Sequence, residues 1–362
     1  MSRPPMGPRG ATGWSRRALL LSALSALPAP VAWALPARTL QFPRDFGSHP
    51  ELRTEWWYIT GQARAGGREF GFQLTFFRSR VDATQGMRSA FAARQLIFAH
   101  AAITDLEGRK LWHDQRIARE GFGIASASEA DTDLRLRDWS LRRDGSGYAA
   151  RLPASGFAID LRFAPTQPLL LQGNAGLSRK GPEPEQASYY YSEPQLAATG
   201  SLTVQGKRFE VQGRAWLDHE WSEALLHPEA TGWDWIGMNL FDGGALTAFR
   251  LRRRDGSALW HGGSLRTADG RLQVFGPDAL RFEALQRWTS PRTRAVYPTQ
   301  WRIHTPAGVF TVRALLDDQE LDGQGATGTV YWEGLSELLD ADGRAVGRGY
   351  LELTGYAQAL KF

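Results

Sequence analysis

Arg214-Ala-Trp-Leu-Asp-His-Glu-Trp-Ser222 is the stretch of sequence from which the fold of this chain is best interpreted. Its second half alternates in the way that is typical of a β-strand, because successive strand side chains point to opposite faces. His219 and Trp221 then share one face, and Asp218 and Glu220 share the other. The stretch therefore predicts a strand that carries titratable groups on both of its faces.

A second aromatic stretch, Gly232-Trp-Asp-Trp-Ile-Gly-Met-Asn-Leu240, follows after a short connection. Trp233 and Trp235 share a strand face, and Asp234 points to the opposite one. Two such strands can form a pocket wall of indole rings and a few polar groups, as in many small-molecule sites. The same tryptophans can also form an ordinary core, because aromatic residues dominate cores. These residues alone leave both interpretations open.

Length and composition indicate a globular chain built mainly of strands. A single hydrophobic core rarely grows to 362 residues, so two domains are expected. The contents of 42% hydrophobic and 22% charged residues are globular values. The 39 glycines, 19 prolines and 11% aromatic residues favour short strands and turns. We predict an all-β fold of the sandwich or barrel type.

The formal net charge of +5 comes mostly from the N-terminus. Arg3, Arg9, Arg16 and Arg17 lie in the first 34 residues, which leaves 39 basic against 38 acidic side chains in the remainder. This nearly neutral body gives no electrostatic case for binding nucleic acid or an anionic membrane, so no nucleic-acid partner is expected. The chain has no cysteine, which excludes disulfides, thiolate metal sites and a cysteine nucleophile.

Residues 1–34 have the order of an export signal. The twin arginine Arg16-Arg17 precedes an apolar run, and Ala32-Trp33-Ala34 offers a cleavage site. We therefore predict a Tat-type signal peptide, a mature chain that begins near Leu35, and a periplasmic or secreted protein. The apolar run is too short to span a bilayer, so no transmembrane segment is expected in the mature chain.

The groups in this sequence that could carry out chemistry are acids and imidazoles beside indole rings. The sequence contains no phosphate-binding loop, no G-x-S-x-G elbow and no H-E-x-x-H helix, so neither a cofactor nor a metal is expected. Indole faces stabilise cations, and burial can keep a carboxyl group protonated. Asp218, Glu220, Asp234, Glu55 or His219 could then protonate an alkene, which water would attack. His219 could equally be a buried structural histidine.

Two further stretches carry candidate binding residues. A strand predicted from Thr54 places Glu55 and Trp57 on one face. Tyr189-Tyr190-Tyr191 follows a polar loop rich in glycine and proline. The tyrosines fit a lid or rim over a ligand mouth, and they also fit a surface turn that enters an edge strand.

Five stretches in order along the chain resemble the AttH-like family, which is related to hydroxyneurosporene synthase, the carotenoid 1,2-hydratase of the CrtC type. These stretches are Phe46-Gly-Ser-His-Pro-Glu-Leu-Arg-Thr-Glu-Trp-Trp-Tyr58, Leu217-Asp-His-Glu-Trp-Ser222, Gly232-Trp-Asp-Trp235, Tyr331-Trp-Glu-Gly334 and Gly347-Arg-Gly-Tyr-Leu-Glu-Leu-Thr-Gly-Tyr356. The resemblance implies two lipocalin-like antiparallel β-barrel domains in tandem, placed here at residues 38–215 and 216–362. It also implies an exported protein, and some members of the family look associated with ABC-type permeases.

The resemblance also implies roles for particular residues. The His-x-Trp pair of the hydratases is matched by His219 and Trp221. Where the hydratases have Tyr-x-Asp, this chain has tryptophan, aspartate, tryptophan, so the nearest acids are Asp234 and Asp218. These four residues are the predicted catalytic set. The predicted ligand-binding residues are Trp57, Glu55, Trp233, Trp235 and Tyr190.

The expected function is binding of an apolar isoprenoid, carotenoid or lipid, with carotenoid 1,2-hydratase-type activity as a further expectation. An enzyme of this kind would be a hydro-lyase. The alternative is a non-catalytic periplasmic accessory protein of an ABC-type lipid or lipoprotein export system.

Overall fold

The structure is a computed structural model that describes residues 34–360 except 225 and 326–327. In this part the chain is almost entirely β-sheet, with two short 3-10 turns, η1 (Arg44–Phe46) and η2 (Asp82–Thr84). No helix in the described ranges is both long enough and apolar enough to cross a membrane. The predicted signal peptide, residues 1–34, lies outside the described residues apart from Ala34.

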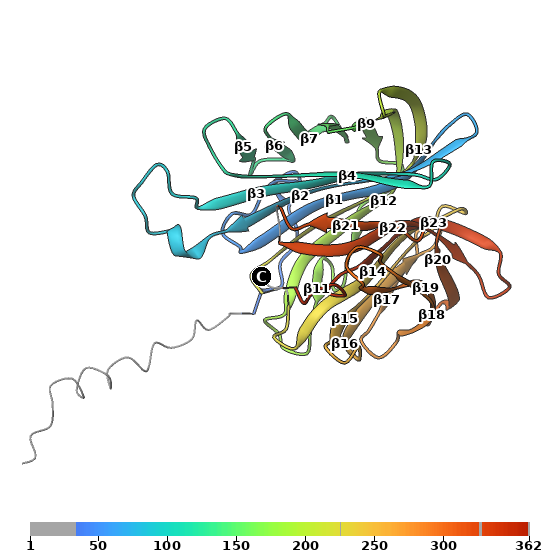
Figure 1. The fold of residues 1–362 in the computed structure, drawn as a ribbon. Helices are drawn as coiled ribbons and strands as arrows, with labels where there is room; N and C mark the ends of the chain where they lie inside the picture. The colour runs from blue at the N-terminus through green and yellow to red at the C-terminus, as the bar shows by residue number, and fades with distance from the viewer. Residues whose placement is uncertain (1–33, 225, 326–327, 361–362) are drawn as a thin grey trace, which may run out of the picture. The chain divides into compact units, whose positions relative to one another are not determined.

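Sheet A contains thirteen antiparallel strands, which run from blue to yellow-green in Figure 1. Eleven follow the order β4-β3-β2-β1-β13-β12-β9-β8-β7-β6-β5, and β10 and β11 both pair with β12. The two strands at the ends of this order, β4 and β5, are consecutive in the chain, and the sheet is nearly closed into a barrel. The strands are β1 (Thr54–Ala65), β2 (Arg68–Arg80), β3 (Gln95–Asp105), β4 (Lys110–Arg119), β5 (Ala125–Ala127), β6 (Asp133–Leu136), β7 (Trp139–Asp144), β8 (Gly147–Pro153), β9 (Phe157–Ala164), β10 (Leu170–Leu171), β11 (Leu177–Arg179), β12 (Ala187–Val204) and β13 (Lys207–Ser222).

Sheet B contains ten antiparallel strands, drawn from yellow to red in Figure 1. Nine follow the order β17-β16-β15-β14-β23-β22-β20-β19-β18, and β21 pairs with β22. The strands are β14 (Ala230–Leu240), β15 (Ala245–Arg253), β16 (Ala258–Arg266), β17 (Leu272–Phe275), β18 (Arg281–Thr289), β19 (Val296–Thr305), β20 (Gly308–Ala314), β21 (Glu320–Gly323), β22 (Thr329–Leu339) and β23 (Ala345–Leu353).

Each sheet encloses an apolar core that follows from the alternation of its strands. In β9, Phe157, Ile159, Leu161 and Phe163 are buried, and the residues between them are more exposed. This period of two is expected for strands with one face inside and one outside. The predicted all-β, lipocalin-like fold is confirmed: two antiparallel sheets form it, and the first is a nearly closed barrel.

The two sheets pack against each other through buried polar contacts as well as apolar side chains. The Tyr58 hydroxyl of β1 donates to Glu333 Oε1 of β22 at 2.6 Å. The Thr104 hydroxyl of β3 donates to Gln319 Oε1 at 2.8 Å. The change from sheet A to sheet B falls in the connection between β13 and β14, residues 223–229. The domain limits of 38–215 and 216–362 stay a prediction.

Candidate functional site

Strand β13 separates two environments with its two faces. Asp218 and Glu220 line a pocket between the sheets, whereas His219 and Trp221 point into the barrel of sheet A. Trp221 and His219 are both 0% exposed. The alternation predicted from the sequence therefore holds, and the two acids and the histidine of this strand serve different sites.

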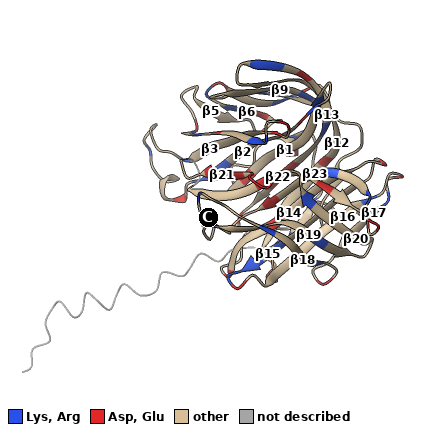
Figure 2. Cartoon of the chain, turned by 45° about the vertical axis from the view of Figure 1, so that its right-hand side comes forward, with Lys and Arg blue, Asp and Glu red and all other residues tan. Residues whose placement is uncertain are grey.

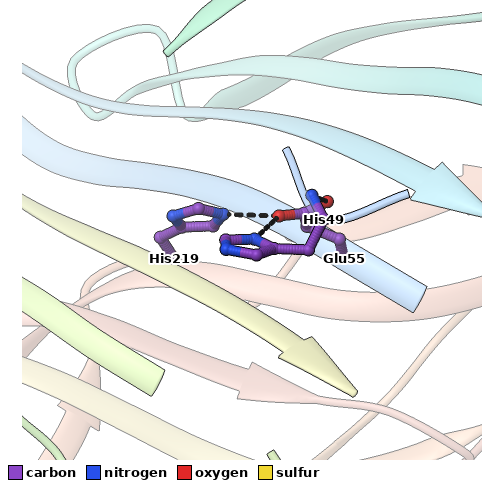
Figure 3. Close-up of side chains that lie close together, drawn as sticks. All are labelled: His49, Glu55 and His219. Carbon is purple, nitrogen blue, oxygen red and sulfur yellow. Dashed lines mark hydrogen bonds and ion pairs between the residues drawn. The ribbon is translucent and has the colours of Figure 1, made fainter. Parts of the chain in front are cut away.

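His219 belongs to a buried cluster with His49 and Glu55 (Figure 3). Its Nε2 lies 2.9 Å from Glu55 Oε1, and its Nδ1 lies 3.1 Å from the Tyr191 hydroxyl. The ring stacks on Trp57 with a centroid separation of 4.5 Å. Burial lowers the pKa of His219 to about 4 and outweighs the opposing effect of Glu55, so the ring is neutral at neutral pH.

His49 is the charged member of this cluster. Its Nδ1 lies 2.8 Å from Glu55 Oε1 and its Nε2 lies 2.9 Å from Asp45 Oδ1. A ring with an ionised carboxylate at each nitrogen must carry both protons. Burial alone would lower the pKa of His49, but the hydrogen bonds to the two carboxylates outweigh it and raise the pKa.

The same three residues have the composition of a metal site. His49, Glu55 and His219 offer atoms that all lie within 4.8 Å of one another, and zinc is held by such side chains. Here, however, each of these atoms has a hydrogen-bond partner inside the protein. Arg78 Nε also lies 2.8 Å from Glu55 Oε2 and supplies positive charge where a cation would otherwise do so. The geometry favours a hydrogen-bonded network that ties residues 45–49 to the barrel.

The pocket between the sheets has a volume of about 980 Å³, including its opening to solvent. Strands of both sheets line it. Its wall is mainly aromatic and aliphatic, the usual make-up of a site for an apolar ligand. The apolar lining residues are Trp56, Tyr58, Phe77, Phe98, Tyr190, Leu226, Trp233, Trp235, Phe249, Leu251 and Tyr331.

Two carboxyl groups of sheet B face this apolar wall. Glu333 of β22 and Glu352 of β23 are cross-strand partners, and both line the pocket. Burial and the neighbouring Glu352 raise the pKa of Glu333 well above its ordinary value. Burial raises the pKa of Glu352 to about 7, although the Trp233 indole N–H donates to it at 2.9 Å. At neutral pH the pair therefore holds a proton inside an apolar pocket. Figure 2 shows acidic segments in red on the central strands, β22 among them.

Asp218 and Glu220 complete a group of four carboxyls in the pocket. Asp218 accepts hydrogen bonds from Ser192, Tyr190 and Trp216 at 2.5, 2.8 and 2.7 Å. Burial raises its pKa to about 7, and the three donors oppose this rise. Because three donors favour the ionised form, Asp218 holds a proton less firmly than Glu333, which accepts one hydrogen bond, from Tyr58. Glu220 is ion-paired with Lys180 at 2.9 Å.

Asp234 lies on the far side of β14 from the pocket. The carboxylate is 0% exposed and lies 2.6 Å from Arg250 Nε and 3.1 Å from Arg252 Nε. The Tyr356 hydroxyl also donates to it, at 2.8 Å. The register of β14 shifts between Ala230 and Gly232, and pairing is regular at Asp234. Strand alternation therefore turns this carboxylate away from Trp233 and Trp235.

The other predicted residues divide between the same two environments. Trp233, Trp235 and Tyr190 line the pocket, and Trp57 lies in the core of sheet A. Glu55 borders the pocket, but its carboxylate bonds to the histidine cluster. The three tyrosines form neither a lid nor an edge strand, because β12 is paired on both sides.

Glu333 and Glu352 were missed as candidate residues, although both lie in stretches that carry the family resemblance. The available signal was alternation: Tyr331 and Glu333, and likewise Tyr350 and Glu352, share a face of a strand rich in apolar residues. An acid in phase with buried aromatic residues is a candidate for a raised pKa.

The model of the AttH-like family matches residues 33–356, almost the whole described chain. The chain belongs to the AttH-like family. The crystal structure of an AttH protein from Nitrosomonas europaea is similar to this AttH-like chain, with 46% identity and a TM-score of 0.84. The match covers 89% of this chain and 99% of that one.

Two kievitone hydratases are also similar to this AttH-like chain. The protein from Fusarium solani subsp. phaseoli is 25% identical over 248 residues, which cover 65% of this chain and 67% of that protein. The crystal structure of kievitone hydratase from Nectria haematococca has a TM-score of 0.67 and 16% identity, and the match covers 90% of this chain and 98% of that one. This second likeness is one of fold.

Proposed function

We propose that this protein binds an apolar, isoprenoid-type molecule in the pocket between its sheets and adds water to a carbon–carbon double bond of that molecule. The observation that carries the proposal is the cross-strand pair Glu333–Glu352, which lies in a pocket lined by indole rings, where burial raises the pKa of both carboxyls. The similarity to hydratases supports the same reaction class. The exported location predicted from residues 1–34 is part of the proposal.

The reaction balances with the groups that the pocket contains. The carboxylic acid of the pair gives its proton to one alkene carbon, and a carbocation forms on the other. Indole faces such as those of Trp233 and Trp235 stabilise the cation. Water attacks the cation and returns a proton to the carboxylate, which restores the acid. The sum is alkene plus water to alcohol, with no change in the enzyme and no external oxidant or reductant.

The test is hydration in ¹⁸O-labelled water, with an acyclic carotenoid and with kievitone as candidate substrates. Wild type should yield an alcohol that carries ¹⁸O, and Glu333→Gln should lower the rate by at least about 100-fold because the proton donor is lost. The rate should also fall on the alkaline side, at the pH where Glu333 itself loses its proton, because burial and Glu352 raise the pKa of Glu333 well above its ordinary value. The amide preserves an acceptor for the Tyr58 hydroxyl, so the fold should be kept.

Glu337→Gln is the matched control, because Glu337 lies on the same strand, outside the pocket lining, and pairs with Arg313. Equal rates for wild type and Glu333→Gln would remove Glu333 from the mechanism. A wild-type protein that binds ligand without forming alcohol would instead support the alternative, a non-catalytic carrier that serves an ABC-type lipid or lipoprotein export system.

A further inference from the structure

An exposed apolar cluster lies at the end of sheet A where β2 runs into β3 and β4 runs into β5. The loop between β2 and β3 lies at the left of Figure 1. We refer to the four exposed side chains of these connections as the aromatic tip: Met87 at 50%, Phe91 at 72%, Phe122 at 55% and Ile124 at 44% exposed. Contiguous exposed apolar patches often mark interaction sites, whereas single exposed apolar residues are normal.

Two loops that are distant in sequence build the aromatic tip together. The rings of Phe91 and Phe122 stack with a centroid separation of 5.5 Å and an interplanar angle of 13°. The Arg119 guanidinium lies 4.1 Å from the centroid of Phe122 and 5.3 Å from that of Phe91. The tip is therefore a surface on which a cation lies directly beside exposed rings.

Arginines without carboxylate partners surround the aromatic tip. Arg88 and Arg94 are exposed and Arg119 is half-buried, and none of the three has an ion pair within the described part of the chain. Arg80 at the base of the same loop, in contrast, pairs with Asp82 and Glu223 at 2.7 and 2.8 Å. The nearly neutral total charge of the body thus hides a local excess of positive charge at this tip, next to a partly buried Glu120.

A row of apolar side chains runs from the pocket across the strands of sheet A to β4. Trp56 is the cross-strand partner of Phe77, Phe77 of Phe98, and Phe98 of Ile117. Cross-strand partners point to the same face of a sheet. The first three residues line the pocket, and Ile117 is 36% exposed.

The neighbouring row on the same face leads to the aromatic tip itself. Ser79 pairs with Leu96, and Leu96 pairs with Arg119. The guanidinium of Arg119 lies over the rings of Phe91 and Phe122. The sheet face that forms one wall of the pocket is therefore continuous with the surface that ends at the tip.

We propose that the aromatic tip docks onto a lipid membrane with anionic headgroups, so that an apolar ligand passes between the bilayer and the pocket. This rests on the proposed function for the nature of the ligand. A stable protein interface needs about 800 Å² per partner, and four side chains on two loops fall well short of this. Apolar side chains at loop ends, flanked by arginines, instead match insertion into the headgroup region with phosphates beside the guanidinium groups.

The test is co-sedimentation of the full chain with vesicles of phosphatidylcholine that contain phosphatidylglycerol, without ligand. Phe91→Ser combined with Phe122→Ser should lower the partition coefficient at least about tenfold, since two apolar rings no longer leave water. Phe241→Ser is the matched control, because Phe241 is 61% exposed in the β14–β15 turn of sheet B. Arg88→Ala with Arg94→Ala should weaken the dependence on phosphatidylglycerol, with Arg119 left in place.

The proposal is overturned if wild type stays in the supernatant, or if the double phenylalanine variant binds vesicles as wild type does. Wild type that stays in the supernatant would favour a protein partner for the aromatic tip. Because no ligand is present, a failed hydration assay does not affect this outcome. With detergent-solubilised substrate the double variant should match the wild-type rate, and with substrate supplied in vesicles it should be slower.

Discussion

His49 is held in a charged form by two carboxylates, and this makes one residue a source of pH-dependent stability. The hydrogen bonds to Asp45 and Glu55 raise the pKa of His49 against the effect of burial. A histidine with a raised pKa contributes stability that is fully present below its unfolded pKa of about 6.5 and is lost as the pH rises through the folded pKa. The stability that His49 contributes is therefore lost as the pH becomes alkaline.

We predict that His49→Gln destabilises the protein by about 3–5 kcal/mol at pH 6, because two buried carboxylates each lose one of their cationic partners. The free-energy difference between pH 6 and pH 9 should be smaller in the variant than in wild type. Urea unfolding at both pH values measures this. His304→Gln is the control, since His304 is partly exposed on β19. Parallel pH profiles for wild type and His49→Gln would contradict a charged His49.

Residue-level alternation was predictable from the sequence, but the partners of each residue were not. The period of two placed Asp218 and His219 on opposite faces correctly. Which face meets the pocket depends on how sheet B packs on sheet A, and no local pattern contains that. The Glu333–Glu352 pair arises from the register of β22 and β23, so the sequence could mark each glutamate as a candidate but could not bring the two together.

At the scale of the element, β13 and β14 place tryptophans of different roles close together along the chain. Trp221 of β13 is 0% exposed and stacks on His49 with a centroid separation of 4.0 Å. Trp233 of β14 is half-buried and lines the pocket. The two interpretations left open by the sequence, core and pocket wall, therefore each describe part of the tryptophan set.

We predict that Trp221→Ala lowers the free energy of unfolding by about 3–5 kcal/mol through the cavity it leaves, with little effect on ligand affinity. Trp233→Ala should do the reverse and weaken binding of an acyclic isoprenoid more than it lowers stability. Thermal unfolding and fluorescence titration of both variants separate the two effects. If Trp221→Ala weakened binding and left stability intact, our assignment of the two faces of β13 would be wrong.

At the scale of the whole molecule, the pocket exists because two sheets from one chain pack face to face. The four carboxyls of the pocket come from β13, β22 and β23, so neither sheet contains the complete group. The all-β class followed from the composition, and the lipocalin-like fold followed from the family resemblance. The assembly of the pocket did not, because it depends on buried contacts such as Tyr58 to Glu333, which join residues far apart in sequence.

The absence of cysteine bears on how such a molecule would be exported. A fold that needs no disulfide can form in a reducing cytoplasm. The twin arginine at Arg16 and Arg17 predicts a Tat-type route.

Lysine at both positions keeps the positive charge and removes the guanidinium groups that define the pair. We predict that Arg16→Lys with Arg17→Lys traps full-length precursor in the cytoplasm as a folded, protease-resistant body. Cell fractionation and intact mass of the purified protein measure this, with Arg3→Lys and Arg9→Lys as a control of equal charge. A double variant that is still processed to an N-terminus near Leu35 would contradict the Tat route and leave export by another route open.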